Sequence, residues 1–188
     1  KEIGVPLTGL TMFNFSNFTG ILTRFLNLFS IENPANVVFI AYKNRDVDFF
    51  NYAVRQRLGR TQVLEVQDYV ILENNLIYEN QLITKGERGI VIEVGSKEQK
   101  ANLDFCEATI EFKNSEGNPI LVRRKVLLNW LSKDVSDPMS SEIKNLAHER
   151  KAQNPKYRES DRISDDEFLS SLRLRYAYAI TCHKAQGS

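Results

Sequence analysis

The hydrophobic positions near the start of the chain change between helical and strand spacing. In 17–29, "NFTGILTRFLNLF", apolar residues recur every three to four positions behind Asn17, a typical cap, so this segment predicts a core-facing helix. The run 36–42, "NVVFIAY", is typical of a strand covered on both faces, as in a parallel sheet. Helical spacing returns in 43–59, which Gly59 would end. Strand, short loop and helix make half of a βαβ unit.

Residues 63–131 consist of short stretches of alternating apolar and polar residues. These stretches are "DYVILEN", "GIVIEVG", "LDFCEATIEFKN" and "PILVRRKVLLNW", and turn-forming sequences such as "TKGERG" and "NSEGNP" separate them. Short strands at this spacing predict a small antiparallel barrel or sheet.

The last part of the chain predicts helix and then one strand. Helical spacing over 137–154 begins with Asp137 and Pro138, which suit a cap and a first-turn proline. The segment 172–181, "LRLRYAYAIT", alternates as a strand does. If this strand runs parallel to 36–42, the polar residues 181–188 emerge at the carboxyl edge of the sheet, where open α/β folds bind ligands.

Composition narrows the setting. The chain has 188 residues, 42% of them hydrophobic, which suffices for one compact domain or for a modest domain with a small insertion. A formal charge of +1 means that any phosphate affinity must come from locally clustered cations. Cys106 and Cys182 form neither a disulfide-rich nor a zinc-site pattern, which favours a reducing, cytoplasmic location. No apolar stretch approaches the roughly 20 residues of a membrane span, so no membrane partner is expected.

The terminal segment 180–188, "ITCHKAQGS", offers a hydroxyl, an imidazole, an ammonium, an amide and a glycine that permits close backbone approach. This set of donors suits phosphate oxygens. The alternative from the residues alone is a solvated polar strand end without a ligand. A Cys182–His183 nucleophile pair is disfavoured because adjacent strand residues point to opposite faces.

Three segments resemble superfamily 1 DNA helicases of the RecD/Dda-like branch, which includes the exonuclease V alpha subunit. "YAYAITCHKAQGS" is similar to motif V of that family. "VVFIAYKNRDVDFFNYAVRQRLG" resembles the motif IV region, in which a strand ends in asparagine and the next helix carries an asparagine and an arginine. "QDYVILENNLIYENQLITKGERGIV" resembles the entry into a small inserted barrel of the Src-homology-three type. The three matches keep the family's order over about 37–188.

The resemblance implies an α/β fold. It is that of a partial RecA-like (P-loop NTPase) second motor domain with a parallel sheet and an inserted small antiparallel β-barrel. On this basis 1–62 begin the RecA-like domain, 63–132 form the barrel, and 133–188 return through a helical connection to motif V. The sequence contains no G-x-x-x-x-G-K-[ST] loop for nucleotide phosphates. The chain is therefore expected to be a fragment cut just after motif V, inactive in ATP hydrolysis by itself.

The resemblance also implies roles for individual residues. Contacts to single-stranded DNA are expected from Asn44, Thr181, His183 and Lys184, and coupling to ATP from Gln186, Gly187 and Ser188. Departures from the family pattern are Cys182, at a more often aliphatic position, and the absence of a following glutamate. ATP and Mg²⁺ are expected to bind the parent protein and not this chain. The implied partners are single-stranded DNA and the first RecA-like domain of the same parent.

Two further possibilities come from the residues of the middle segment. Arg123 and Arg124 are candidates to follow a phosphate backbone, although strand alternation turns at least one of them elsewhere. The alternative function is a non-enzymatic nucleic-acid- or protein-binding module built on the small β-barrel, because such barrels host many unrelated functions.

Overall fold

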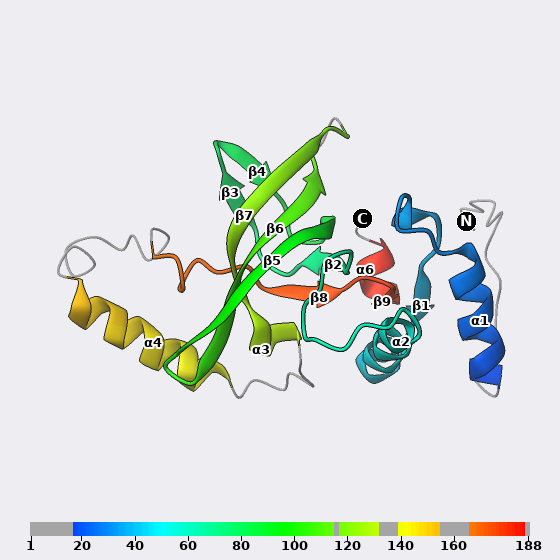
Figure 1. Ribbon diagram of the computed structural model, residues 1–188, viewed down its shortest axis with the longest axis horizontal. Helices are drawn as coiled ribbons and strands as arrows, with labels where there is room; N and C mark the ends of the chain where they lie inside the picture. Colours follow the sequence, from blue (N-terminus) through cyan, green and yellow to red (C-terminus); the bar gives the residue numbers. More distant parts are fainter. Residues whose placement is uncertain (1–16, 115–116, 132–138, 155–165, 187–188) are drawn as a thin grey trace, which may run out of the picture.

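A computed structural model describes residues 17–114, 117–131, 139–154 and 166–186. Within these residues the fold is mixed α/β, with a five-stranded antiparallel sheet, a two-stranded parallel sheet and a two-stranded hairpin. The molecule is elongated: the parallel strands and the first helices lie at one end, the antiparallel sheet in the middle and α4 at the other end (Figure 1). No helix of the described ranges has the length and apolar character needed to span a bilayer.

The elements expected at the start of the chain are present. Helix α1 spans Phe18–Leu28, and the Asn17 side chain accepts the Gly20 N–H at 3.2 Å, as expected of a cap. A short 3₁₀ turn, η2 (Pro34–Asn36), leads to strand β1 (Phe39–Ala41) and helix α2 (Asn44–Arg57). Gly59, at φ +75°, follows the end of α2. The expectation that the strand is covered on both faces is wrong, because Ile40 in its middle is 39% exposed.

The single strand predicted over 172–181 is two strands in different sheets. Strand β8 (Leu174–Tyr176) pairs antiparallel with β2 (Tyr69–Leu72), and β9 (Ala179–Thr181) pairs parallel with β1. The parallel alignment with β1 was predicted and is confirmed for β9. The chain changes sheets at Ala177 and Tyr178, both fully buried. The alternation of apolar and polar residues predicted one strand, because it carries no information about which neighbouring strand each residue pairs with.

The antiparallel sheet has the order β7-β6-β5-β2-β8. Its remaining strands are β5 (Arg88–Lys100), β6 (Leu103–Lys113) and β7 (Pro119–Leu127), and the hairpin β3 (Leu76–Tyr78) and β4 (Gln81–Ile83) is inserted between β2 and β5. The predicted barrel is not closed among the described residues. In the described residues, β7 and the chain just before β8 are joined by one isolated bridge, Val126 to Leu172. The sheet therefore includes residues from both sides of the domain boundary predicted at 132/133.

Three groups of buried side chains hold these elements together. One lies against the antiparallel sheet, the second packs α1 and α2 against β9, and the third packs α4 (Met139–Gln153) against β6 through Leu146 and Phe105. Short helices α3 (Leu128–Leu131) and α6 (Cys182–Gln186) follow β7 and β9 directly. The helix predicted over 137–154 corresponds to α4, while the predicted cap residues Asp137 and Pro138 lie outside the described residues.

Gly89 allows β5 and β6 to approach closely, and an alanine there should destabilise the sheet. An added Cβ would lie 2.7 Å from the Glu111 carbonyl oxygen and 2.9 Å from Phe112 Cδ1. Because backbone cannot yield as a flexible side chain does, Gly89→Ala should lower the free energy of unfolding by about 2 kcal/mol, measured by urea denaturation. Gly95→Ala is the control, since its Cβ would come no closer than 3.3 Å to any neighbour. Equal losses in the two variants would contradict this account.

Candidate nucleic-acid interface

The ends of β1 and β9 meet at one edge of the parallel sheet. Ala41 is the register partner of Thr181; α6 begins directly after β9, and two residues separate the end of β1 from the start of α2. A small crevice of about 20 Å³ lies at this edge, and Asn44, Thr181 and Lys184 are among its lining residues. The structure therefore brings Asn44 next to Thr181 and Lys184, more than 130 positions later in the chain, as the helicase resemblance implied. Their role as DNA contacts stays a prediction.

The polar segment after β9 is helical. Residues 182–186 form α6, in which His183 is exposed, whereas Thr181 at the end of β9 is only 9% exposed. His183 can therefore reach a ligand in solvent more readily than Thr181. Gln186 is the last residue of α6, and Gly187 and Ser188 lie outside the described residues. The predicted coupling role of these last three residues also stays a prediction.

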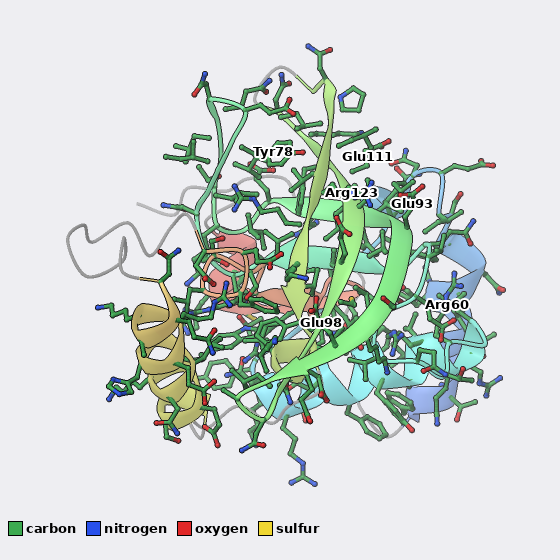
Figure 2. The ribbon with its side chains drawn as sticks, turned by 60° about the vertical axis from the view of Figure 1, so that its left-hand side comes forward. Arg60, Tyr78, Glu93, Glu98, Glu111 and Arg123 are labelled. Atoms are coloured by element: carbon green, nitrogen blue, oxygen red, sulfur yellow. The ribbon has the colours of Figure 1, made fainter. Side chains whose placement is uncertain are left out.

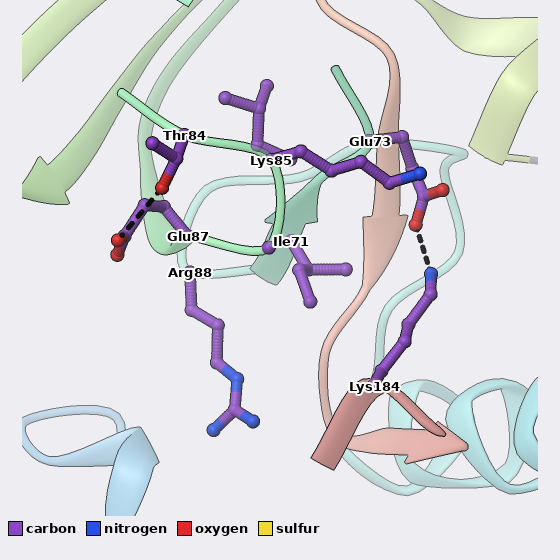
Figure 3. A pocket seen from close by; sticks show the side chains of 9 residues that line it. Ile71, Glu73, Thr84, Lys85, Glu87, Arg88 and Lys184 are labelled. Atoms are coloured by element: carbon purple, nitrogen blue, oxygen red, sulfur yellow. Dashed lines mark hydrogen bonds and ion pairs between the residues drawn. The ribbon is translucent and has the colours of Figure 1, made fainter. Parts of the chain in front are cut away.

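Lys184 has a partner that the sequence did not indicate. Its ammonium group forms an ion pair with the carboxylate of Glu73, which follows β2 in the antiparallel sheet (Figure 3). The Lys184 side chain is 34% exposed and that of Glu73 only 13%. The pair links the end of the parallel sheet to the antiparallel sheet, so a phosphate that binds Lys184 must compete with Glu73.

A larger pocket adjoins the crevice and shares Ile71 and Lys184 with it. The pocket has a volume of about 370 Å³ and lies between the end of β2, the turn from β4 to β5, and α6. Two of its cations, Lys85 and Arg88, were missed in the sequence because "TKGERG" was interpreted only as a turn. The signal available was that this turn places cations on both sides of Gly86.

Arg123 and Arg124 point to opposite faces of β7, as strand alternation requires. Arg123 lies on the exposed face, where its Nε donates to Glu107 Oε1 at 2.7 Å. Glu93 lines the same shallow hollow and projects near Arg123 (Figure 2). Arg124 instead donates to Ser170 Oγ at 3.1 Å on the other face. Neighbouring carboxylates make the Arg123 face unfavourable for a phosphate backbone. The role of both arginines as DNA contacts stays a prediction.

Asn51 of α2 holds the segment where the chain passes from β8 to β9. Its side-chain oxygen accepts the Ala179 N–H at 2.8 Å, and its nitrogen donates to the carbonyl oxygens of Tyr176 and Ala179 at 3.2 and 3.3 Å. The side chain is buried, with 3% of the residue exposed. Asn51 thus satisfies backbone groups that neither sheet can pair at this crossing.

A buried charge pair lies next to this crossing. The guanidinium of Arg55 donates to both carboxylate oxygens of Asp68 at 2.9 Å and stacks over the Tyr176 ring, with its central carbon 4.3 Å from the ring centre. The Tyr178 hydroxyl donates to Asp68 at 3.3 Å. Burial disfavours the charge of Arg55, but Asp68 and the two tyrosines outweigh it and the pKa of Arg55 is raised. Burial raises the pKa of Tyr178 as well.

The sequence pattern did not lead us to predict a structural role for Asn51 or Arg55, although it contained a signal for one. Both continue the stripe of Val47, Phe50 and Val54 along α2, at positions that the helical period turns inward. A polar residue on such a stripe must find buried partners. The identity of those partners depends on the tertiary structure.

Glu65, in the loop that connects α2 to β2, should make stability depend on pH. Its Oε1 accepts the N–H groups of Gln62 and Thr61 at 2.5 Å each, and the Gln62 bond, against the opposing effect of burial, lowers the pKa of Glu65. A carboxyl whose pKa is lowered by folding stabilises above its unfolded pKa and loses that contribution as pH falls. The wild type should therefore be more stable than Glu65→Gln at pH 7, and the difference should vanish between about pH 5 and 3. Urea denaturation across this range measures it, and a constant difference would contradict the assignment.

Comparison with known proteins adds no assignment: no family model matches the chain, and no curated protein matches it. Within the described part of the chain no three His, Cys, Asp or Glu side chains gather as a group that could hold a metal ion.

Proposed function

We propose that this chain is part of an ATP-driven DNA helicase of the superfamily 1 RecD/Dda-like branch, and that it contributes contacts to single-stranded DNA. In this proposal β1, α2, β9 and α6 belong to the second RecA-like motor domain, and the antiparallel sheet is its insertion. The observation that carries the proposal is the parallel pairing of β1 with β9, because it sets Asn44 beside Thr181 and Lys184.

The donors at this edge suit a phosphate backbone. Thr181 supplies a hydroxyl, His183 an exposed imidazole and Lys184 an ammonium. Helix α2, 14 residues long, begins at the same edge with Asn44, and the amide groups of a helix N-terminus favour anions. The formal charge of +1 leaves this local cluster, and not the overall field, as the source of affinity.

ATP and Mg²⁺ belong to this proposal only as ligands of the parent protein. The chain has no G-x-x-x-x-G-K-[ST] loop, so by itself it lacks the segment that would hold the phosphates of a nucleoside triphosphate. In the parent protein, ATP supplies the free energy for alternating closure of two motor domains, while the residues near β9 hold the single-stranded DNA. The 188-residue chain should show no ATP hydrolysis above buffer, checked by phosphate release.

Binding of single-stranded DNA tests the proposal. Fluorescence anisotropy with a labelled oligonucleotide should show weak binding at low salt. Because each phosphate contact on a single strand adds about 0.7 to the slope of log affinity against log salt, Lys184→Ala should lower that slope by about 0.7. Lys97→Ala, an exposed lysine on β5, is the matched control and should leave the slope unchanged. Absence of binding, or equal slopes in all three proteins, would contradict the proposed interface.

The binding-module alternative is favoured by one surface feature. Ile77 and Leu82 are cross-strand partners on the β3–β4 hairpin, and they are 69% and 61% exposed. Contiguous exposed apolar surface is a feature of protein-contact sites. A nucleotide-binding loop and an arginine-bearing motif elsewhere in the same reading frame would favour the motor, whereas a reading frame without them would favour the module.

A further inference from the structure

The pocket between the β4–β5 turn, the end of β2 and α6 joins the two sheets (Figure 3). Its volume of about 370 Å³ is within the usual range of small-ligand sites, roughly 300–1,000 Å³. Gly86 forms part of the wall, and an added Cβ there would meet nothing within 4 Å, so the turn leaves open space. The pocket continues into the crevice at Thr181 through the shared Lys184.

The charges around this pocket are arranged about Glu73. Lys184 pairs with the Glu73 carboxylate from one side, and the Lys85 side chain points toward Glu73 from another (Figure 3). The other carboxylate, Glu87, accepts a hydrogen bond from the Thr84 hydroxyl at 3.4 Å. Glu73 is thus the anion that the lysines of this pocket face.

We propose that this pocket is a phosphate-binding subsite, in which Lys85 and Lys184 hold the phosphate. When the phosphate is absent, the Glu73 carboxylate takes its place beside the two ammonium groups. A phosphate offers the same acceptor chemistry as the Glu73 carboxylate and can replace it once that side chain turns outward. The inference rests on the proposed function for its main ligand, the backbone of single-stranded DNA. It adds to that function a residue from the antiparallel sheet, Lys85, and an internal competitor, Glu73.

Removal of the competitor is the central test. Glu73→Gln keeps the size of the side chain and frees the charge of Lys184, so the 188-residue chain should bind the labelled oligonucleotide about fivefold more tightly. The salt slope should stay that of the wild type, because Lys184 makes the same single phosphate contact in both proteins. Glu79→Gln is the matched control: it removes the same charge from the exposed β3–β4 turn and should change neither quantity. Lys184→Gln added to Glu73→Gln should abolish the gain.

Lys85 is tested separately. Lys85→Ala should weaken oligonucleotide binding about fivefold, whereas Lys97→Ala, which removes the same charge from the middle of β5, should not. Circular dichroism and urea denaturation of every variant separate a loss of affinity from a loss of folding.

Inorganic pyrophosphate distinguishes the two sources of phosphate. Competition by pyrophosphate at an ionic strength where chloride does not compete indicates a free phosphate compound, and its failure to compete beside tight oligonucleotide binding indicates the DNA backbone. Either result supports the subsite if Glu73→Gln strengthens binding of the ligand concerned, pyrophosphate in the first case and the oligonucleotide in the second. Oligonucleotide binding that Glu73→Gln and Glu79→Gln alter equally overturns the subsite but leaves the proposed function. If the oligonucleotide does not bind at all, the proposed function fails. The subsite is then tested by NMR, as changes in the amide chemical shifts of Gly86 and Lys184 when pyrophosphate is added to Glu73→Gln. If these shifts do not change, the subsite is overturned.

Discussion

Replacement of Asp68 by alanine should lower the free energy of unfolding by about 3–5 kcal/mol, because it leaves the charge of Arg55 buried without its partner. Asp68 is fully buried and Arg55 is 6% exposed, so water cannot replace the lost carboxylate. The Glu65 N–H and the Tyr178 hydroxyl also lose an acceptor, since they donate to Asp68 at 2.8 and 3.3 Å. Urea denaturation followed by circular dichroism measures the loss.

A double variant separates the charge effect from packing. Removing both partners of a buried pair in favour of apolar side chains often costs little. The combination of Arg55→Met with Asp68→Leu should therefore be more stable than Asp68→Ala alone. If the double variant is the less stable of the two, packing and not the unpaired charge dominates at this position.

Replacement of Asn51 by alanine should lower the free energy of unfolding by about 3 kcal/mol, because each buried backbone group left without a partner costs about 1–3 kcal/mol. The groups concerned are the N–H and carbonyl of Ala179 and the carbonyl of Tyr176. The loss should be concentrated where the chain enters β9. Hydrogen exchange of the amides of Ala179 and Ile180 should accelerate more than that of β6.

Asn51→Asp is the informative companion variant. Aspartate keeps the shape and still accepts the Ala179 N–H, but it cannot donate to the two carbonyls and brings a charge into a buried position. We expect it to be at least as destabilising as Asn51→Ala. An Asn51→Asp protein as stable as the wild type would show that the two donated hydrogen bonds contribute nothing.

The same crossing connects stability to the proposed DNA contacts. Asn51 bonds to Ala179 at the start of β9, and the preceding residue, Tyr178, donates to Asp68. Thr181 is the last residue of β9, and Lys184 lies in α6 directly after it. Because β9 has only three residues, its position depends on these buried partners and on β1. Variants of Asn51 should therefore weaken oligonucleotide binding even at temperatures where the protein stays folded, measured by the same anisotropy assay.

Local periodicity in the sequence determined much of the architecture. Helices α1 and α2, their ends at Asn17 and Gly59, and the antiparallel strands of the middle segment follow from apolar spacing and turn residues, because these depend on neighbours within a few positions. The parallel alignment of β1 with β9 was expected from the helicase resemblance and not from periodicity, and it is present. The polar residues at the ends of the two strands therefore fall at one edge.

Contacts between distant residues decided the rest. Asn51, more than a hundred residues earlier, holds the point where 172–181 divides into β8 and β9, and β8 joins the antiparallel sheet beside β2, at the opposite edge from β7. The partner of Lys184 is Glu73, and the pocket that contains both exists only where the two sheets meet. Hydrophobic spacing specifies which face of an element is buried, but it carries no information about which distant charge or backbone group lies opposite.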